Sequence, residues 1–169
     1  MHCPSCGSLS LVAQGPKAYA CTQCAFTYFH NTASAVLAVI TYENEVLVAV
    51  RGREPGKGML DLPGGFVDYD ESLETALCRE LQEELNITLP PEQLRYMGSA
   101  PNTYRYRDIE YKTCDVFFHI ALTQRPDVQA GDDVAALKWV TASNLHAEDF
   151  AFPSATLALQ RAGLLKSVC

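Results

Sequence analysis

Apolar and polar positions along the chain predict a mixed α/β fold. Two runs rich in β-branched residues, 33–41 and 45–50, flank the polar segment Tyr42-Glu43-Asn44, and such a pattern predicts a β-hairpin. The run 112–122 is apolar almost throughout. This is typical of a strand buried on both faces, so we expect it near the middle of a sheet. Shorter strands are predicted at 94–99 and 136–140.

Two segments are predicted to be helices. The first follows Asp70 and Ser72, which are both candidate N-caps, and ends before Pro90-Pro91. The second is predicted at 154–165, directly after Pro153. Helices packed on a mixed sheet make α/β the expected fold class.

Three glutamates are concentrated on the first of these helices. Glu80, Glu83 and Glu84 stand at i, i+3 and i+4, where like charges repel and destabilise an isolated helix. At about 100° per residue, Glu80 and Glu84 share an arc of roughly 60° with Leu73 and Leu77. A merely solvated acidic face would lie opposite the leucines. Because Mg²⁺ and Mn²⁺ prefer hard carboxylate oxygens, the pattern predicts a divalent-metal site.

These glutamates belong to a longer pattern that resembles the Nudix box. The matching positions are Gly65, Glu71, Arg79, Glu80, Leu81, Glu83, Glu84 and Ile87. The sequence departs from the box at Asn86, where the family usually has glycine, but asparagine also tolerates the left-handed conformation that ends helices. The segment 62–67 resembles the usual approach to the box. The resemblance implies a Nudix α/β/α sandwich with a mixed sheet at residues 31–169.

The same resemblance implies an enzyme that hydrolyses the diphosphate linkage of a nucleoside diphosphate joined to another group. Glu80, Glu83 and Glu84 would hold Mg²⁺ or Mn²⁺, while Glu71 and Arg79 would orient them, with Arg79 pairing to a glutamate. The metal would neutralise the diphosphate, position the attacking water and lower its pKa. Glu83, Glu84 or a base from a separate loop would take the proton.

A second chemical feature lies at the N-terminus. Cys3, Cys6, Cys21 and Cys24 form two Cys-x-x-Cys pairs, the spacing of a zinc site with four thiolate ligands. Two disulfides or a redox dithiol are the alternatives, but no secretory signal precedes Cys3, and a redox motif would not recur over so short a span. A segment this small cannot build a sufficient core without a metal. We therefore expect a structural zinc ribbon at residues 1–30.

Composition narrows the class of protein. The chain has 169 residues, of which 48% are hydrophobic, and a formal net charge of −7. That charge disfavours a general nucleic-acid binder, because phosphate backbones select basic surfaces. The longest apolar run, 35–40, is too short to cross a membrane. We expect a cytoplasmic enzyme that acts on a small nucleotide-derived substrate; a homodimer is left open.

The substrate is less strongly indicated. A zinc ribbon before a Nudix box resembles the arrangement of NADH pyrophosphatases, but of their downstream signature only Ser99 and Pro101 are present. Substrate contacts are expected at Gly65, Arg51 and Tyr104-Arg105, where aromatic and guanidinium groups could bind a base and a phosphate. The last segment also has the alternation of a half-exposed edge strand.

These features favour a diphosphate of the NADH, NAD or ADP-ribose type. Deoxynucleoside triphosphates and dinucleoside polyphosphates are alternative substrates. A non-catalytic nucleotide sensor or zinc-ribbon adaptor is an alternative of another class. Loss of Glu80, Glu83 or Glu84 would favour that alternative, but all three are present. A capped or NAD-bearing RNA end is a further alternative. The acidic net charge disfavours it, as does the lack of any lysine or arginine other than Lys17 near the cysteines.

Overall fold

The computed structural model describes residues 1–128, 130 and 134–166. The chain divides into two compact units, Met1–Thr32 and Ala33–Cys169. Positions 129, 131–133 and 167–169, which fall within the predicted Nudix domain at 31–169, lie outside the described residues.

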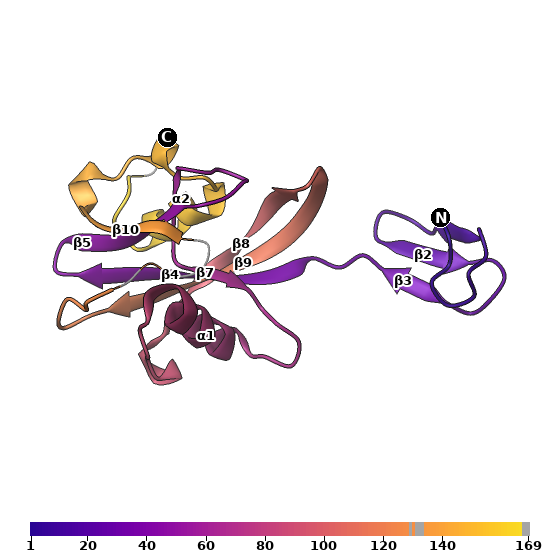
Figure 1. Ribbon diagram of the computed structural model, residues 1–169, viewed down its shortest axis with the longest axis horizontal. Helices are drawn as coiled ribbons and strands as arrows, with labels where there is room; N and C mark the ends of the chain where they lie inside the picture. The colour runs from indigo at the N-terminus through magenta and orange to yellow at the C-terminus, as the bar shows by residue number, and fades with distance from the viewer. Residues whose placement is uncertain (129, 131–133, 167–169) are drawn as a thin grey trace. The chain divides into compact units, whose positions relative to one another are not determined.

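The small unit is a three-stranded antiparallel sheet in the order β1-β2-β3 (Figure 1). Its strands are β1 (Leu11–Ala13), β2 (Ala18–Cys21) and β3 (Thr27–Phe29). Its buried apolar residues are Cys3, Leu11 and Cys21. Two of these three are cysteines, so the unit has little hydrophobic core of its own, as expected for so short a segment.

The large unit is built on a seven-stranded mixed sheet, counted over the described residues, with the main order β10-β5-β4-β9-β8. Strand β6 pairs with β5, and β7 pairs with β4. The β4–β9 pair is parallel and the other pairs are antiparallel. The strands are β4 (Ala33–Tyr42), β5 (Glu45–Arg51), β6 (Leu60–Asp61), β7 (Gly64–Phe66), β8 (Arg95–Tyr106), β9 (Ile109–Ala121) and β10 (Val134–Thr141).

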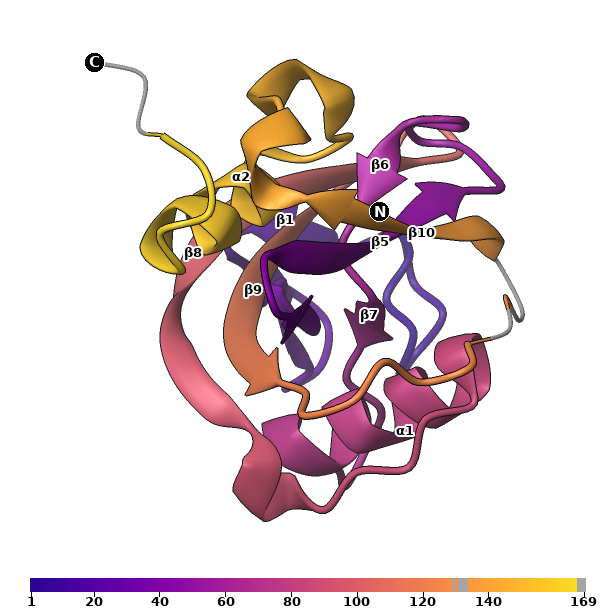
Figure 2. The same cartoon turned by 90° about the vertical axis from the view of Figure 1, so that its left-hand side faces the viewer.

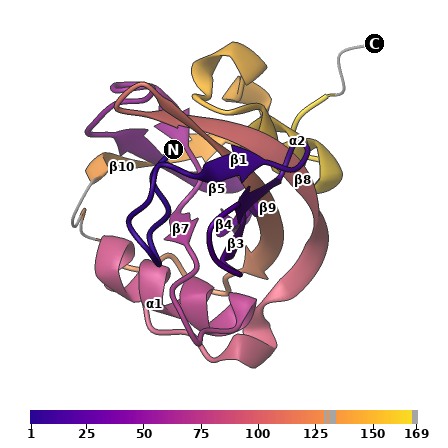
Figure 3. The ribbon, with the colours of Figure 1, turned by 90° about the vertical axis from the view of Figure 1, so that its right-hand side faces the viewer.

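Two α-helices cover opposite faces of this sheet. Helix α1 (Leu73–Leu85) and helix α2 (Pro153–Arg161) lie on either side of it in three views (Figures 1, 2 and 3). Successive residues of β4 serve the two faces: Val36 and Ala38 pack with α1, whereas Leu37 and Val39 pack with α2. The expected α/β sandwich is confirmed. Three short 3₁₀ helices complete the fold: η1 (Pro91–Gln93), η2 (Ala142–Asn144) and η3 (Ala147–Asp149).

Most predicted elements are present, with corrected lengths. The hairpin of β4 and β5 turns at Glu43-Asn44 and pairs Tyr42 with Glu45, and β9 lies inside the sheet as predicted. The strand predicted at 94–99 is wrong in length, because β8 continues to Tyr106 through its antiparallel register with β9. The second helix ends at Arg161 rather than at residue 165. The sequence did not predict β6 or β7, since both strands are very short.

None of the helices within the described ranges is long and apolar enough to span a bilayer.

The N-cap of α1 provides a test of the fold. Ser72, not Asp70, caps the helix: its Oγ accepts a hydrogen bond from the Thr75 backbone N at 3.1 Å. We expect Ser72→Ala to lower the free energy of unfolding by about 1 kcal/mol, because a helix-terminal N–H loses its acceptor. Urea denaturation measures the change, with Ser143→Ala on the exposed helix η2 as control. An equal effect of the two substitutions would contradict this account.

Candidate active site and candidate metal centre

Helix α1 carries the acidic residues, and its two ends are fixed locally. Ser72 caps the start, and Asn86 ends the helix in the left-handed conformation with φ 55°. The backbone N of Asn86 donates to Gln82 O at 3.1 Å. The expectation that Asn86 can replace the usual glycine at this helix end is confirmed, since asparagine tolerates this conformation better than most residues.

Two glycines of β7 allow the helix and the sheet to come close together. A Cβ on Gly64 would strike the carbonyl oxygen of Val36, and a Cβ on Gly65 would lie 2.5 Å from Glu80 Oε1. The Glu80 carboxylate therefore occupies the space beside the Gly65 backbone. The backbone N of Gly64 donates to Glu84 Oε2 at 3.0 Å. Any larger residue at either position would displace strand β7 or a carboxylate.

Arg79 is the centre of a hydrogen-bond network. Its Nε and Nη2 donate to the two carboxylate oxygens of Glu71 at 2.9 and 3.0 Å, a bidentate geometry that is among the stronger ion-pair arrangements. Its Nη1 donates to Glu80 Oε1 at 2.9 Å and to Glu83 Oε2 at 3.1 Å. Nη2 also donates to the carbonyl oxygen of Phe66 at 3.1 Å. Arg79 thus pairs with glutamates of its own chain.

The charges in this network respond to their surroundings. Hydrogen bonding from Arg79 is the main cause that lowers the pKa of Glu71. Burial is the main cause that raises the pKa of Glu80, although Arg79 opposes it. A partly buried carboxylate is stabilised in its ionised form by a nearby cation. The position of Glu80 is therefore one where a divalent ion would be favoured.

Glu80, Glu83 and Glu84 line one cavity of about 380 Å³ together with Arg79 and Gly65. The side chain of Glu83 is 53% exposed and that of Glu80 is 15% exposed, so the cluster reaches from the helix interface to solvent. In the described part of the chain, only the four N-terminal cysteines bring three or more candidate ligand atoms within 4.8 Å of one another. The glutamates are held slightly apart by Arg79 and by the Gly64 amide. They offer the oxygen ligands that Mg²⁺ and Mn²⁺ prefer.

The other predicted substrate contacts differ in their placement. Arg51 and Tyr104 line the same cavity as the glutamates. Arg51 is held by two acceptors: its Nη1 donates to Asp61 Oδ2 at 2.7 Å and its Nε to Pro55 O at 2.6 Å. Arg105, one residue after Tyr104, is not among the residues that line this cavity and pairs with Asp108 at 3.1 Å. Alternation along β8 separates the two side chains.

A second, smaller cavity of about 80 Å³ adjoins the first and shares Arg51, Gly65 and Tyr104 with it. Sequence reasoning missed several residues of its lining, namely Asp61, Phe66, Asn102, Thr113, Asp115, Phe152 and Ser154. One signal was available: Asp115 is the single acidic residue in the apolar run 112–122. Asn102, Phe152 and Ser154 carry no such signal, because they reach the cavity only through the pairing of β8 and the packing of α2.

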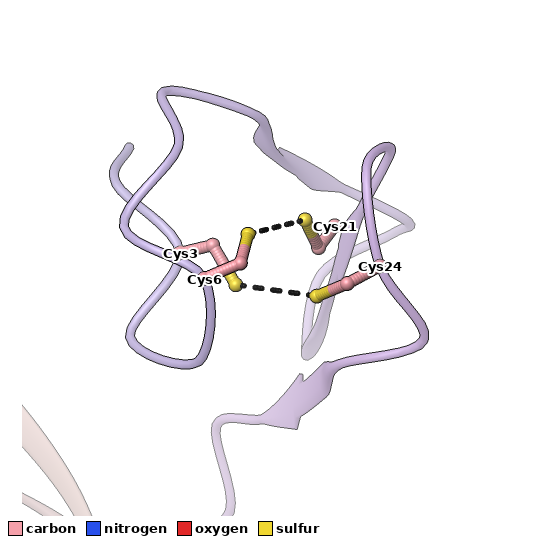
Figure 4. A group of neighbouring side chains, drawn as sticks. All are labelled: Cys3, Cys6, Cys21 and Cys24. Atoms are coloured by element: carbon pink, nitrogen blue, oxygen red, sulfur yellow. Dashed lines mark hydrogen bonds between the residues drawn. The ribbon is translucent and has the colours of Figure 1, made fainter.

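The N-terminal cysteines come together in the small unit (Figure 4). The Sγ atoms of Cys3 and Cys24 lie 3.8 Å apart, and those of Cys6 and Cys21 lie 3.7 Å apart. A disulfide would need about 2.05 Å. Four sulfurs about 2.3 Å from a tetrahedral zinc would be separated by about 3.8 Å. A hydrogen bond with Ser10 is the main cause that lowers the pKa of Cys21 to about 5, which favours the thiolate.

Comparison with known proteins identifies similar sequences. The chain is 31% identical over 118 residues to the ADP-ribose pyrophosphatase of Methanocaldococcus jannaschii, covering 70% of this chain and 66% of that one. It is 27% identical over 143 residues to the NAD-capped RNA hydrolase NudC of Vibrio vulnificus, covering 85% of this chain and 51% of that one. The chain therefore spans about half to two thirds of the length of these curated relatives.

A solved structure and a family model extend the comparison. The crystal structure of a NUDIX hydrolase from Nitrosomonas europaea shares the fold, with a TM-score of 0.70 and 23% identity over 94% of this chain and 88% of that one. The family model of the NUDIX domain matches residues 31–160. That match covers most of the chain and includes the whole of helix α1 and the two glycines of strand β7, so the chain belongs to the Nudix family.

Proposed function

We propose that this protein catalyses the divalent-metal-dependent hydrolysis of a diphosphate linkage in a nucleoside diphosphate derivative of the NAD(H) or ADP-ribose type. The observation that carries the proposal is the shared cavity of Glu80, Glu83 and Glu84 beside a second cavity with an aromatic wall. The first cavity suits a diphosphate with its metal, and the second suits a group attached to that diphosphate. The two named relatives, an ADP-ribose pyrophosphatase and an NAD-capped RNA hydrolase, support this choice of substrate.

Each residue of the acidic network has a role in this proposal. Glu80, Glu83 and Glu84 would hold Mg²⁺ or Mn²⁺, which when bound neutralises the diphosphate and lowers the pKa of the attacking water. Arg79 and Glu71 are positioning residues, because their bidentate pair holds Glu80 and Glu83 on the cavity wall. Glu83 or Glu84 would take the proton from the attacking water, since both line the cavity.

The segment expected to distinguish among substrates contributes two residues to the smaller cavity. The segment 99–104, which departs from the NADH pyrophosphatase signature, lies in β8, and its Asn102 and Tyr104 line the smaller cavity. Tyr104 packs against Phe66 and Phe152 with ring centroids 5.5 and 5.8 Å apart. Such a wall can bind a planar ring. Gly65 and Arg51 would contact the diphosphate end of the same substrate.

An NAD-bearing RNA end is a second candidate substrate, favoured by one observation on the small unit. All three residues of β3 are exposed, and among them Tyr28 and Phe29 are 45% and 60% exposed. Exposed aromatic side chains can stack on unpaired bases. The net charge of −7 opposes strong nucleic-acid binding, so we place this substrate second.

We further propose that the small unit is a zinc ribbon. The sulfur separations of 3.7 and 3.8 Å support tetrahedral thiolate coordination. Since four protein thiolates complete the coordination of zinc, this metal would be structural.

The glutamate assignment predicts a loss of turnover without a loss of fold. We expect Glu83→Gln and Glu84→Gln each to lower kcat by at least about 100-fold, because each removes a charged oxygen ligand or the base. The assay is chromatography of the two monophosphate products with Mg²⁺ present: AMP and ribose 5-phosphate from ADP-ribose, AMP and reduced nicotinamide mononucleotide from NADH, and nicotinamide mononucleotide and 5′-monophosphate RNA from NAD-capped RNA. Glu74→Gln on the exposed first turn of the same helix is the matched control. Full activity in both variants would refute the catalytic assignment.

The close approach at Gly65 predicts a metal-dependent defect. In Gly65→Ala the new Cβ would lie 2.5 Å from Glu80 Oε1, so the carboxylate must move. We expect the Mg²⁺ concentration for half-maximal activity to rise by about 10–100-fold, because the ligand is displaced rather than removed. Metal titrations at saturating substrate measure the shift. Unchanged metal dependence would show that Glu80 does not bind the activating metal.

The zinc proposal predicts one tightly bound metal ion per chain. Cys3→Ser combined with Cys21→Ser should abolish zinc binding and unfold the small unit, because too few thiolates remain. Elemental analysis of the purified protein measures zinc content. Cys114→Ser, which changes a cysteine of β9 outside the cluster, should retain the metal. Retention of zinc by the double variant would exclude the four-cysteine site.

A further inference from the structure

Buried polar side chains of the large unit are gathered in one place. Over its described residues, the buried polar or charged side chains are Asp61, Thr113, Asp115 and Ser154. All four line the smaller cavity. Burial of polar groups is unfavourable unless they find partners, and the packing of two helices on a sheet does not require them here. Their concentration indicates a cavity built for a polar ligand.

Ser154 is the clearest sign of a missing partner. Its side chain is 2% exposed, and its Oγ is the one buried side-chain polar atom in the described ranges without a hydrogen bond. It lies in the first turn of α2, which has no side-chain cap. Such an unpaired hydroxyl destabilises the free protein. A ligand in the smaller cavity would give it a partner.

Asp115 indicates what the ligand must offer. Its side chain is 4% exposed and accepts hydrogen bonds from Asn102 Nδ2 at 2.9 Å and from Thr113 Oγ1 at 2.6 Å. An ionised carboxylate has about four lone-pair positions, so two of them can still accept. The ligand should therefore bring N–H or O–H donors.

A second carboxylate makes the cavity floor rich in acceptors. Asp61 accepts hydrogen bonds from Arg51 and from the Leu62 backbone N at 2.7 and 2.9 Å. Burial is the main cause that raises the pKa of Asp61, and the nearby charge of Asp115 adds to it. A carbonyl oxygen placed beside Asp115 would face acceptor oxygens and find no donor among them. An amine would be attracted.

The wall of the cavity indicates that the ligand is planar. The Tyr104 ring packs between those of Phe66 and Phe152. The Arg51 guanidinium lies 4.8 Å from the Phe152 ring centroid. Gly64, Gly65 and Phe66 line both cavities. A ring stacked on this wall would therefore lie next to a diphosphate bound at the glutamates.

We propose that the smaller cavity binds the edge of an amino-substituted nucleobase, whose amine donates to Asp115 and whose ring nitrogen pairs with the Ser154 hydroxyl. This inference rests on the proposed diphosphatase function, because the base would belong to its substrate. Adenine, guanine and cytosine carry such an amine, whereas uracil and hypoxanthine have a carbonyl group in its place. Asp115 and Ser154 are thus assigned as specificity-determining residues.

The test compares nucleotides that differ by one amine. Isothermal titration of the full chain with AMP against IMP, and with CMP against UMP, should show about tenfold tighter binding of the amino-bearing member of each pair. In Asp115→Asn the new amide can donate to a carbonyl, so the preference should vanish or reverse. Glu110→Gln, an exposed carboxylate on the same strand, is the matched control and should keep the wild-type preference.

Ser154→Ala provides an independent test that does not depend on the folding of the Asp115 variant. Removing an unpaired buried hydroxyl should raise the Tm of the free protein by roughly 2–4 °C. The same change should weaken AMP binding by several-fold, because the hydroxyl is paired only in the complex. A purely structural serine would not change stability and affinity in opposite directions.

Several results would overturn the inference. Equal binding of AMP and IMP would show that the cavity does not recognise the amine. If AMP and IMP bind equally but 2′-deoxy-AMP binds more weakly, the cavity holds the ribose instead. Hydrolysis of ADP-ribose is measured in parallel: its absence contradicts the proposed function, whereas hydrolysis without discrimination between adenine and hypoxanthine contradicts only the base assignment.

Discussion

The guanidinium of Arg79 holds together the loop before α1, the strand β7 and the helix itself. It donates five hydrogen bonds, to both oxygens of Glu71, to Glu80, to Glu83 and to the Phe66 carbonyl. Arginine alone has a planar set of donors that can satisfy so many acceptors at once. The pattern works only because Gly65 leaves room for the Glu80 carboxylate. Arg79 thereby keeps the carboxylates of Glu80 and Glu83 side by side, and the Gly64 backbone N holds that of Glu84, an arrangement that would suit the proposed metal site.

Among the described residues of the large unit, all buried polar side chains line the smaller cavity. Its remaining core is apolar on both sides of the sheet, around α1 and around α2. Buried carboxylates and an unpaired hydroxyl weaken a fold, and departures from an apolar core are expected at functional sites. In the proposed function the two cavities therefore have different roles: the glutamates of the larger one would bind a cation, and the smaller one places acceptors beside an aromatic wall.

Local sequence patterns predicted the parts of the fold that depend on near neighbours. The hairpin at Glu43-Asn44, the end of α1 at Asn86 and the interior position of β9 all follow from turn chemistry or apolar patterning. The length of β8 did not, because residues 100–106 are partly polar and are ordered by pairing with β9. Strand β7 was missed for a similar reason: a strand with two glycines has no propensity of its own and forms because β4 lies beside it.

By itself, the sequence determined that the chain carries a Nudix box and a cluster of four cysteines, since both depend on fixed spacing within short segments. It also placed Glu80 and Glu84 on the leucine side of one helix, because helical periodicity is local. Only the tertiary structure decided which distant groups surround them. Asp61, Asp115 and Ser154 come from separate elements and meet in one cavity, because long-range strand pairing and helix packing, rather than residue spacing, bring them together.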